Sequence, residues 1–171
     1  MLAPSPSAAS SAAHIEIEGK SSAPRGAANL CQTYQWACRQ GRGADKVGNQ
    51  ALETIVHVNR TVNGSVRYLD DQQQFNAADH WSLPTARGGD CEDFALLKKK
   101  TLLKMGFPPQ SLLIATVLDG NRLGHAVLVV RTAKGDLVLD NATDRVLPWS
   151  ETGYVFLRMQ TPKAPSGNAP N

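Results

Sequence analysis

The hydrophobic pattern of this chain changes from a helical period to a strand period close to Gly106, and this change limits the folds that the sequence can adopt. Over residues 47–62, apolar side chains recur every three or four positions, which predicts an amphipathic helix that ends at Asn63-Gly64. The same spacing over residues 91–105 predicts a second helix. Gly106 ends that helix, and Pro108-Pro109 prevents its continuation.

The second half of the chain is divided into short apolar segments rich in β-branched residues. Residues 111–118, 124–131 and 137–140 are separated by an Asp-Gly and a Gly-Asp pair, which are typical of hairpin turns. Residues 154–159 add a fourth, alternating segment after Pro148-Trp149. Helices followed by about four antiparallel strands predict an α+β fold in which the helices pack on the sheet.

The length of 171 residues suits one domain with a hydrophobic core and is too short to divide comfortably into two. We expect this domain to span residues 25–160. Residues 1–24 are expected to form a disordered leader. Residues 1–13 lack the basic and apolar regions of a secretory signal, although they could be the remnant of a trimmed one. Residues 161–171, rich in Pro, Gly, Asn and Ser, are expected to form a disordered tail. No apolar run approaches the roughly 18 residues that a membrane helix needs, so membrane insertion is not expected.

The charge pattern argues against a nucleic-acid partner. The formal net charge is +3, and the charged residues are spread along the chain. One dense basic run, Lys98 to Lys100, falls within the second predicted helix beside several leucines. We interpret this run as a solvated helix face, because a nucleic-acid site needs a broader basic surface with interleaved aromatic residues.

The three cysteines indicate one pair and one free thiol. Six residues lie between Cys31 and Cys38, and this spacing can close a disulfide loop if the backbone brings the two Cα atoms within about 7 Å. A disulfide would indicate an oxidising compartment such as the periplasm. The alternative is two small, half-buried thiols, and the spacing alone does not decide between them. Cys91 is the thiol left over.

Cys91 follows the turn 87–90 and is predicted to open the second helix. Unpaired amides and the helix dipole favour negative charge at this position, so a thiol there is more readily made into a nucleophile. Such a nucleophile also needs a base and a residue that orients the base. His125 and Asp140 lie on two successive predicted strands, a layout that can bring both to Cys91. His80, in the loop before the cysteine, is the competing candidate base.

Taken singly, each of the two proposed helpers also has a structural explanation. On a strand, His125 shares a face with Val127 and Val129, and a histidine among apolar neighbours is more often structural. Asp140 starts an Asp-Asn pair at a strand end, which is a common turn former. The order of the three residues along the chain, rather than any one of them, therefore carries the prediction of a catalytic site.

Three sequence blocks resemble a known family, and they occur in the same order. They are Trp81-Ser82-Leu83-Pro84-Thr85 with Gly89-Asp90-Cys91-Glu92-Asp93-Phe94-Ala95-Leu96, then Gly124-His125-Ala126-Val127-Leu128, then Leu139-Asp140-Asn141. Over residues 47–160 the chain resembles the bacterial transglutaminase-like cysteine proteinases of the papain-like superfamily. The resemblance implies that Cys91 is the nucleophile, His125 the general base and then acid, and Asp140 the residue that orients the imidazole. It implies peptide-bond hydrolysis through a thioester acyl-enzyme, with the oxyanion held by the Cys91 amide and one further donor.

Three carboxylates, those of Asp90, Glu92 and Asp93, surround the predicted nucleophile. In the resembling family, acidic residues that flank the cysteine bind calcium, which implies a Ca²⁺ site with Asp90 and Glu92 as ligands. The alternative is that these carboxylates only cap the N-terminus of the helix, where the helix dipole favours them. Trp81 also has two explanations, a wall of the cleft or an indole donor to the oxyanion, and we favour the wall.

By the same resemblance, we expect a periplasmic cysteine endopeptidase with a protein substrate, and the family suggests a bacterial surface adhesin as that substrate. The regulatory partner that the resemblance implies is an inner-membrane receptor that senses a cyclic dinucleotide. Two alternatives stay open. A transglutaminase-type acyl transferase or deamidase would use the same three residues, whereas a non-catalytic binding module would keep only the fold.

Overall fold

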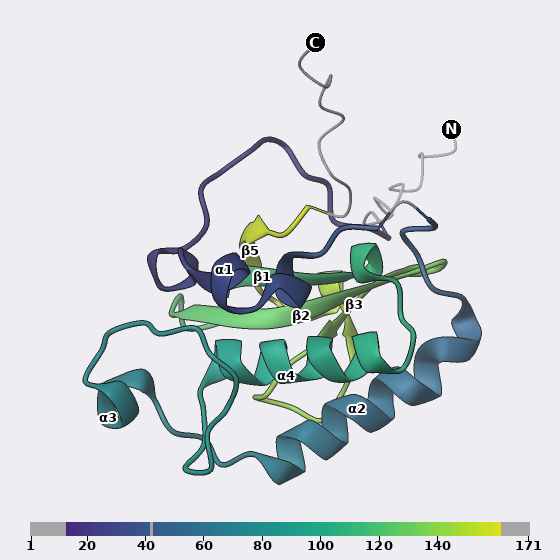
Figure 1. The fold of residues 1–171 in the computed structure, drawn as a ribbon. Helices are drawn as coiled ribbons and strands as arrows, with labels where there is room; N and C mark the ends of the chain where they lie inside the picture. Colours follow the sequence, from purple (N-terminus) through teal and green to yellow (C-terminus); the bar gives the residue numbers. More distant parts are fainter. Residues whose placement is uncertain (1–12, 42, 162–171) are drawn as a thin grey trace, which may run out of the picture.

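The computed structural model describes residues 13–41 and 43–161, and in it the two long helices lie on the same face of one antiparallel sheet (Figure 1). These helices are α2 (Leu52–Ser65) and α4 (Cys91–Lys104), and they correspond to the two predicted helices. The predicted α+β arrangement of helices packed on an antiparallel sheet is therefore confirmed.

The boundaries of α2 differ from the predicted range of 47–62. Val47 pairs with Thr132 of the sheet, and a 3-10 turn, η3 (Asn49–Ala51), comes before the helix. At the other end, α2 continues through Asn63-Gly64 to Ser65. The side-chain amide of Asn63 donates hydrogen bonds to the carbonyl oxygens of Asp140 and Thr143, so this residue ties the helix to another loop instead of ending it.

The sheet has the strand order β4-β3-β2-β1-β5. β1 to β3 match the predicted segments to within two residues, and β4 is an additional short strand. β5 does not extend the series of hairpins, because it crosses over to pair with β1 at the opposite edge of the sheet. The strands are β1 (Leu112–Leu118), β2 (Gly124–Thr132), β3 (Gly135–Leu139), β4 (Leu147–Pro148) and β5 (Val155–Met159).

A short helix, α3 (Asp71–Phe75), lies in the stretch 70–79, which we expected to be only a polar connection. Asp70 Oδ1 accepts a hydrogen bond from the Gln73 N–H and so caps the start of α3. Asn76, with a φ of 53°, ends it in the left-handed conformation. Capping residues, rather than an apolar period, therefore define this helix. The other short elements are η1 (Arg25–Ala27), α1 (Leu30–Thr33), η2 (Gln35–Cys38), η4 (Pro109–Ser111) and η5 (Trp149–Glu151).

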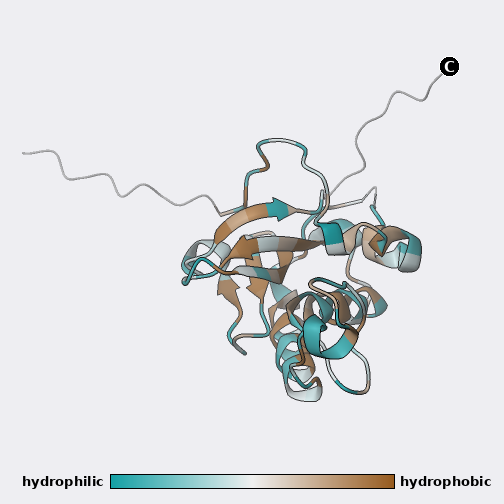
Figure 2. Cartoon of the chain, turned by 90° about the vertical axis from the view of Figure 1, so that its left-hand side faces the viewer, coloured by the Kyte–Doolittle hydropathy of each residue, from teal (hydrophilic) through white to brown (hydrophobic). Residues whose placement is uncertain are grey.

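Apolar side chains cover both faces of the sheet, and Figure 2 shows its strands largely brown. Because successive strand residues point to opposite faces, the two sets alternate along β1 and β2. On the face that carries the helices, the buried cluster includes Ile55, Phe94, Leu96, Ile114, Leu128 and Leu139. On the other face, the buried cluster includes Ile15, Leu113, Val117, Val127, Val129 and Val138.

Two lysines of the basic run are buried, so our interpretation of this run as a solvated helix face was wrong. Lys98 is 0% exposed and Lys99 is 2% exposed. The Lys99 Nζ donates hydrogen bonds to the Ala37 carbonyl and to Gln160 Oε1, at 2.7 Å each. Burial lowers the pKa of each of these two lysines to about 7. Lys99 is buried by a long-range contact, because η2 packs over this side of α4.

Cys31 and Cys38 form a disulfide, with their Cα atoms 5.4 Å apart. Of the two alternatives that their spacing left open, the structure therefore has the bonded one. The disulfide joins α1 to η2, the element whose Ala37 carbonyl accepts the hydrogen bond from Lys99.

The segment around Ile15 was expected to belong to a disordered leader, but it lies against β2 and β3. The Ile15 N–H donates to Asp136 Oδ2 at 2.8 Å, and its carbonyl accepts from Arg131 Nη2 at 2.9 Å. The leader therefore does not extend to this segment. Residues 1–12 and 162–171, which contain the rest of the expected leader and nearly all of the expected tail, lie outside the described residues. Within the described part of the chain, no helix is long and apolar enough to cross a membrane.

Candidate active site

The free thiol, Cys91, is the first residue of α4, and the turn before it fixes this position. Thr85 and Gly88 exchange two backbone hydrogen bonds of 2.9 and 3.1 Å. Gly88 has a φ of +139°, and a Cβ there would lie 2.2 Å from the Arg67 carbonyl oxygen, so only glycine suits this turn. At the start of α4, backbone amides without a partner in the helix and the helix dipole both favour an anion.

His125 and Asp140 lie together, as their order along the chain predicted. His125 is near the start of β2, Asp140 follows the last residue of β3, and His125 Nε2 is 2.8 Å from Asp140 Oδ1. In neutral histidine one ring nitrogen is a donor and the other an acceptor. Since Nε2 donates to the carboxylate, Nδ1 is the nitrogen that is left to accept a proton from a nucleophile.

Two further donors hold the Asp140 carboxylate. The Ala142 N–H donates to Oδ1 at 2.9 Å, and the Tyr154 hydroxyl donates to Oδ2 at 2.6 Å. Burial by itself would raise the pKa of Asp140, but the hydrogen bonds from His125, Ala142 and Tyr154 lower it overall. Asp140 is therefore an anion that can orient and stabilise the imidazole.

Tyr154 is a site residue to which the sequence assigned no role. It immediately precedes β5, and its ring meets the His125 ring edge-on, with 5.8 Å between the ring centroids. The available signal was an aromatic residue at the start of the last predicted strand. The strand order was needed to use this signal, because it is the pairing of β5 with β1 that brings Tyr154 to the triad.

The Cys91 thiol is placed between β2 and a carboxylate. The Ala126 N–H, next in sequence to His125, contacts the sulfur, and the thiol donates to Glu92 Oε2 at 3.1 Å. Burial, the charge of Glu92 and this hydrogen bond raise the pKa of Cys91, while the Ala126 N–H lowers it. The contact with Ala126 brings the nucleophile to the same end of β2 as His125.

Asp90, Glu92 and the unpredicted Asp71 form an acidic cluster, in which one oxygen from each lies within 4.8 Å of the others. Asp90 precedes α4, but its side chain makes no capping hydrogen bond to α4; instead it accepts from the Asp71 N–H. Asp71 Oδ1 and Asp90 Oδ1 are buried without a hydrogen-bond partner among the described residues. Burial raises the pKa of Asp90, and burial with the charge of Asp90 raises that of Glu92 to about 9.

These oxygens fit a hard cation such as Ca²⁺, which binds carboxylates and completes its shell with carbonyl oxygens and water. The alternative explanation, that Asp90 caps the N-terminus of α4, fails because its side chain makes no capping hydrogen bond to that helix. Asp71 went unpredicted because it belongs to α3, 19 residues before Asp90, and only the fold brings the two together. Asp93, by contrast, is not one of the residues whose oxygens converge, and it accepts a hydrogen bond from the Ser82 N–H at 3.0 Å.

The two remaining candidates from the loop before Cys91 have other contacts. The His80 ring packs against the Phe75 ring with 4.5 Å between centroids, and the His80 N–H donates to Asp71 Oδ2. These contacts place His80 beside the acidic cluster. The Trp81 indole N–H donates to Asp79 Oδ1 at 2.9 Å, and its ring packs against the buried cluster on the helix face. Trp81 therefore serves as a packing wall, and its indole N–H is already hydrogen-bonded to Asp79 instead of being free to bind an oxyanion.

Comparison with protein families matches residues 17–167 to the bacterial transglutaminase-like cysteine proteinases. Among solved structures, calcium-bound LapG of Legionella pneumophila matches at 26% identity and a TM-score of 0.57, over 64% of this chain and 64% of that chain. EGTA-treated LapG from the same organism matches at 27% identity and a TM-score of 0.53, over 62% of this chain and 61% of that chain. The chain thus spans less than two thirds of the length of LapG. Comparison with curated protein sequences gives no match.

The family match covers Cys91, His125, Asp140 and the acidic cluster, and the structural matches share the fold on which these residues lie. The resemblance inferred from the three sequence blocks is confirmed. The chain belongs to the family of bacterial transglutaminase-like cysteine proteinases.

Proposed function

We propose that this protein is a periplasmic cysteine endopeptidase that hydrolyses a peptide bond in a bacterial cell-surface protein. The observation that carries the proposal is the geometry at the end of β2. There the Cys91 thiol touches the Ala126 N–H, and the adjacent His125 is hydrogen-bonded to Asp140. This arrangement supplies a nucleophile, a base and an orienting carboxylate on elements of a folded sheet.

In the proposed reaction, the Cys91 sulfur attacks the substrate carbonyl while its proton passes to His125 Nδ1. The backbone N–H of Cys91 has no partner within α4 and stabilises the oxyanion. His125 then gives its proton to the leaving amine, which breaks the peptide bond and leaves a thioester on Cys91. Water, deprotonated by His125, attacks the thioester, releases the acid product and restores the thiol. Asp140 holds the imidazole in the required tautomer throughout.

The periplasmic location in this proposal is supported by the disulfide between Cys31 and Cys38, since disulfides persist in oxidising compartments. A surface adhesin as substrate, and an inner-membrane receptor that sequesters the enzyme, are the specific forms that the family resemblance suggests. Comparative proteomics of cells that carry Cys91→Ala tests the substrate class. We expect at least one surface protein to stay at full length in these cells, and unchanged surface proteins would contradict the proposal.

A calcium ion held by Asp71, Asp90 and Glu92 is part of the proposal. Three observations support it. Carboxylate oxygens of the three residues converge, Asp71 Oδ1 and Asp90 Oδ1 have no hydrogen-bond partner among the described residues, and a calcium-bound form of LapG exists. Bound there, calcium would offset the negative charge beside Cys91 and fix the loop between α3 and α4. Chelation followed by calcium add-back should change the melting temperature and the activity reversibly. A protein indifferent to both treatments would contradict the calcium site.

A thiol-reactive peptide probe tests the catalytic assignment directly. We expect wild-type protein to be labelled, Cys91→Ala not to be labelled, and His125→Ala to be labelled far more slowly. His57→Ala is the matched control, because His57 is exposed on α2 and has no part in the proposed site. Equal labelling of wild type and His125→Ala would contradict an activated thiol and favour a non-catalytic binding module.

An acyl transferase or deamidase would use the same three residues and differ only in what meets the thioester. Mass spectrometry of the products, with and without an amine donor, separates these reactions. Hydrolysed peptide in the presence of the amine supports the endopeptidase, and amine incorporation or conversion of glutamine to glutamate supports the alternative.

A further inference from the structure

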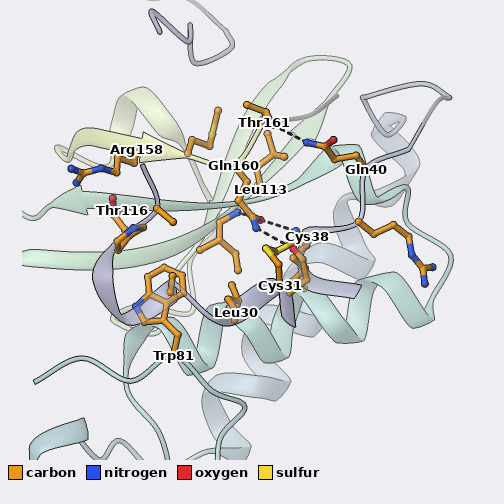
Figure 3. Close-up of a pocket in the computed structure, with 18 of the residues that line it drawn as sticks. Leu30, Cys31, Cys38, Gln40, Trp81, Leu113, Thr116, Arg158, Gln160 and Thr161 are labelled. Carbon is orange, nitrogen blue, oxygen red and sulfur yellow. Dashed lines mark hydrogen bonds between the residues drawn. A yellow bond between two sulfur atoms is a disulfide. The ribbon is translucent and has the colours of Figure 1, made fainter. Parts of the chain in front are cut away.

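A cavity of about 290 Å³ lies on the helix-bearing side of the sheet, between β1, β5 and the segment that contains α1 and η2. We call it the β5 cavity. Figure 3 shows Trp81, Thr116 and Arg158 at one of its ends, and Cys38 and Gln40 at the other. Leu30, Ala27 and Ala37 contribute apolar walls. This volume is at the lower limit of ligand pockets and suits one or two amino-acid side chains.

The strand register connects this cavity to the nucleophile. Thr116 of β1 pairs with Ala126 of β2, and the Ala126 N–H contacts the Cys91 sulfur. Thr116 also pairs with Arg158 of β5, so Ala126, Thr116 and Arg158 form a row across three strands. The row spans two strand spacings, roughly 10 Å. An extended substrate peptide advances about 3.4 Å per residue. The cavity is therefore reached by a substrate side chain two or three residues from the peptide bond that Cys91 attacks.

The charged residues that line the β5 cavity are all basic. The residues that line the β5 cavity include Arg39, Lys99 and Arg158 and no carboxylate. Lys99 is buried and its hydrogen bonds are made within the protein, but Arg158 is exposed and forms no ion pair with a described residue. The acidic cluster, in contrast, lies beside Cys91 on the α3 side. The basic lining therefore favours a substrate carboxylate in the β5 cavity.

Two polar side chains, those of Thr116 and Arg158, line one end of the cavity. Thr116 Oγ1 is buried and has no hydrogen-bond partner among the described residues, although it lines the cavity. The Arg158 guanidinium belongs to the residue paired with Thr116, and a guanidinium binds a carboxylate through two parallel hydrogen bonds. A hydroxyl and a guanidinium at one end of a small apolar cavity match the chemistry of an acidic side chain.

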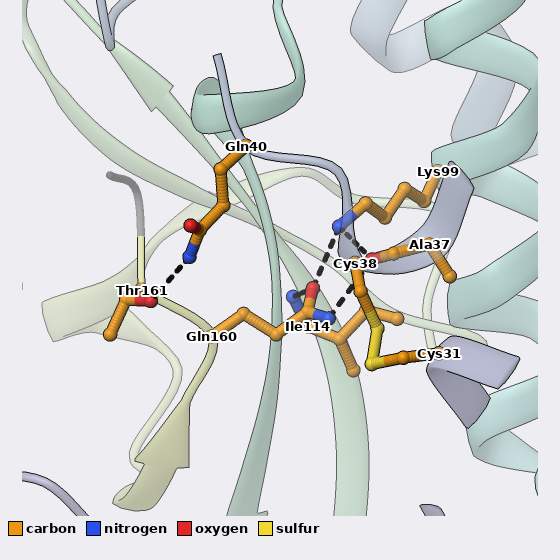
Figure 4. The surroundings of a disulfide bond; sticks show 8 residues. All are labelled: Cys31, Ala37, Cys38, Gln40, Lys99, Ile114, Gln160 and Thr161. Atoms are coloured by element: carbon orange, nitrogen blue, oxygen red, sulfur yellow. Dashed lines mark hydrogen bonds between the residues drawn. A yellow bond between two sulfur atoms is a disulfide. The ribbon is translucent and has the colours of Figure 1, made fainter. Parts of the chain in front are cut away.

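Hydrogen bonds and a disulfide hold the other end of the cavity in place. Figure 4 shows the Cys31–Cys38 disulfide beside the Ala37 carbonyl, which accepts hydrogen bonds from Lys99 Nζ and Gln160 Nε2. Gln160 Oε1 in turn accepts from the Ile114 N–H at 3.0 Å. Because these bonds join η2, α4, β1 and the end of β5, the cavity has a fixed depth. It suits a single side chain better than an inserted helix.

We propose that the β5 cavity is a substrate subsite that selects an acidic side chain, Asp or Glu, two or three residues from the scissile bond. Arg158 pairs with the substrate carboxylate, and Thr116 donates a hydrogen bond to it. This inference rests on the proposed endopeptidase function and adds the substrate class to it.

The test uses the full chain, with calcium present, on a peptide library prepared from a digested bacterial proteome, and the new N-termini are sequenced. We expect wild-type cleavage sites to be enriched in Asp or Glu at a position two or three residues from the cut bond. Two peptides that differ only in Asp or Glu against Asn or Gln at this position are then compared. Arg158→Gln should lower the ratio of their kcat/KM values, acidic over amide, by about five- to tenfold. Arg158→Glu should reverse the preference toward Lys and Arg. Arg60→Glu, on the exposed face of α2, is the charge-matched control and should keep the wild-type preference.

Thr116→Val provides a second variant that keeps side-chain shape and removes only the hydroxyl. It should reduce cleavage of acidic peptides several-fold and leave that of their amide counterparts nearly unchanged. Cleavage without an acidic preference, or a preference retained in Arg158→Glu, would overturn this inference and leave the endopeptidase function standing. Peptide cleavage no greater than that of Cys91→Ala would overturn both.

Discussion

Removing one hydroxyl, in Tyr154→Phe, tests whether the triad depends on β5. The hydroxyl donates to Asp140 Oδ2 at 2.6 Å, whereas the ring contact with His125 would stay. A hydrogen bond to a charged group contributes about 1.5–3 kcal/mol, and Asp140 Oδ2 would lose its donor in a largely buried place. If the carboxylate then shifts, the imidazole loses its fixed orientation. We expect kcat to fall by about tenfold or more with KM nearly unchanged, since about 1.4 kcal/mol corresponds to tenfold.

The same substitution should change the pH dependence of stability in a defined direction. The native pKa of Asp140 is lowered below its ordinary value of 3.8, so its hydrogen bonds stabilise the folded state above that value. The stabilisation is lost as the pH falls through the lowered pKa. Urea unfolding should therefore give wild type a higher free energy of unfolding than Tyr154→Phe at pH 7, and the difference should shrink below about pH 3.8.

Tyr34→Phe is a matched control for the loss of a tyrosine hydroxyl. The Tyr34 hydroxyl accepts a hydrogen bond from the Leu83 N–H, a neutral contact that contributes about 0.5–1.5 kcal/mol. We expect this variant to lose some stability and to keep its kcat. If Tyr154→Phe behaved in the same way, with reduced stability and an unchanged kcat, Tyr154 would only support the fold and the positioning argument would be refuted.

Three other variants test separate parts of the structure. Asp71→Ala should abolish the shift in melting temperature that calcium produces in wild type, because it removes a ligand oxygen; a shift of wild-type size would exclude Asp71 from the site. Replacing both Cys31 and Cys38 by serine should lower the free energy of unfolding by about 2–3 kcal/mol, as expected for a short disulfide loop, and equal urea midpoints would contradict this. Ile15→Ala should cost about 2–4 kcal/mol in urea unfolding because Ile15 is buried, whereas a leader outside the fold would tolerate it without loss.

The parts of the fold that the sequence predicted well are those in which local pattern and final environment agree. α4 starts after a glycine turn and ends at Lys104, just before Met105-Gly106, and both signals are local. The Asp119-Gly120 pair lies in the turn between β1 and β2, whereas the turn between β2 and β3 is Ala133-Lys134 and the Gly-Asp pair after it begins β3. These turn signals also act over a few residues. Local sequence was therefore sufficient for the nucleophile's helix and for the strands that carry its two helpers.

The features that the sequence missed depend on contacts between distant segments. α3 has no apolar period, and its Asp71 meets Asp90 only through the fold. Lys99 reads as a surface residue until η2 covers it. Ile15 lies in a polar stretch, and its burial depends on Arg131 and Asp136, more than a hundred residues away in the chain. A pattern confined to a window of residues does not record such contacts.

The candidate site itself combines both kinds of information, and this has a consequence for how it forms. Cys91 is supplied by α4, His125 by β2, Asp140 by the end of β3, and Tyr154 by the residue before β5. Among the described residues β5 is the last strand in the sequence, yet it pairs with β1, the first. The hydrogen bond from Tyr154 to Asp140 therefore exists only when the C-terminal strand has closed the edge of the sheet. Because the β5 cavity also lies against this strand, the proposed triad and the proposed selection of the substrate depend on the same strand pairing.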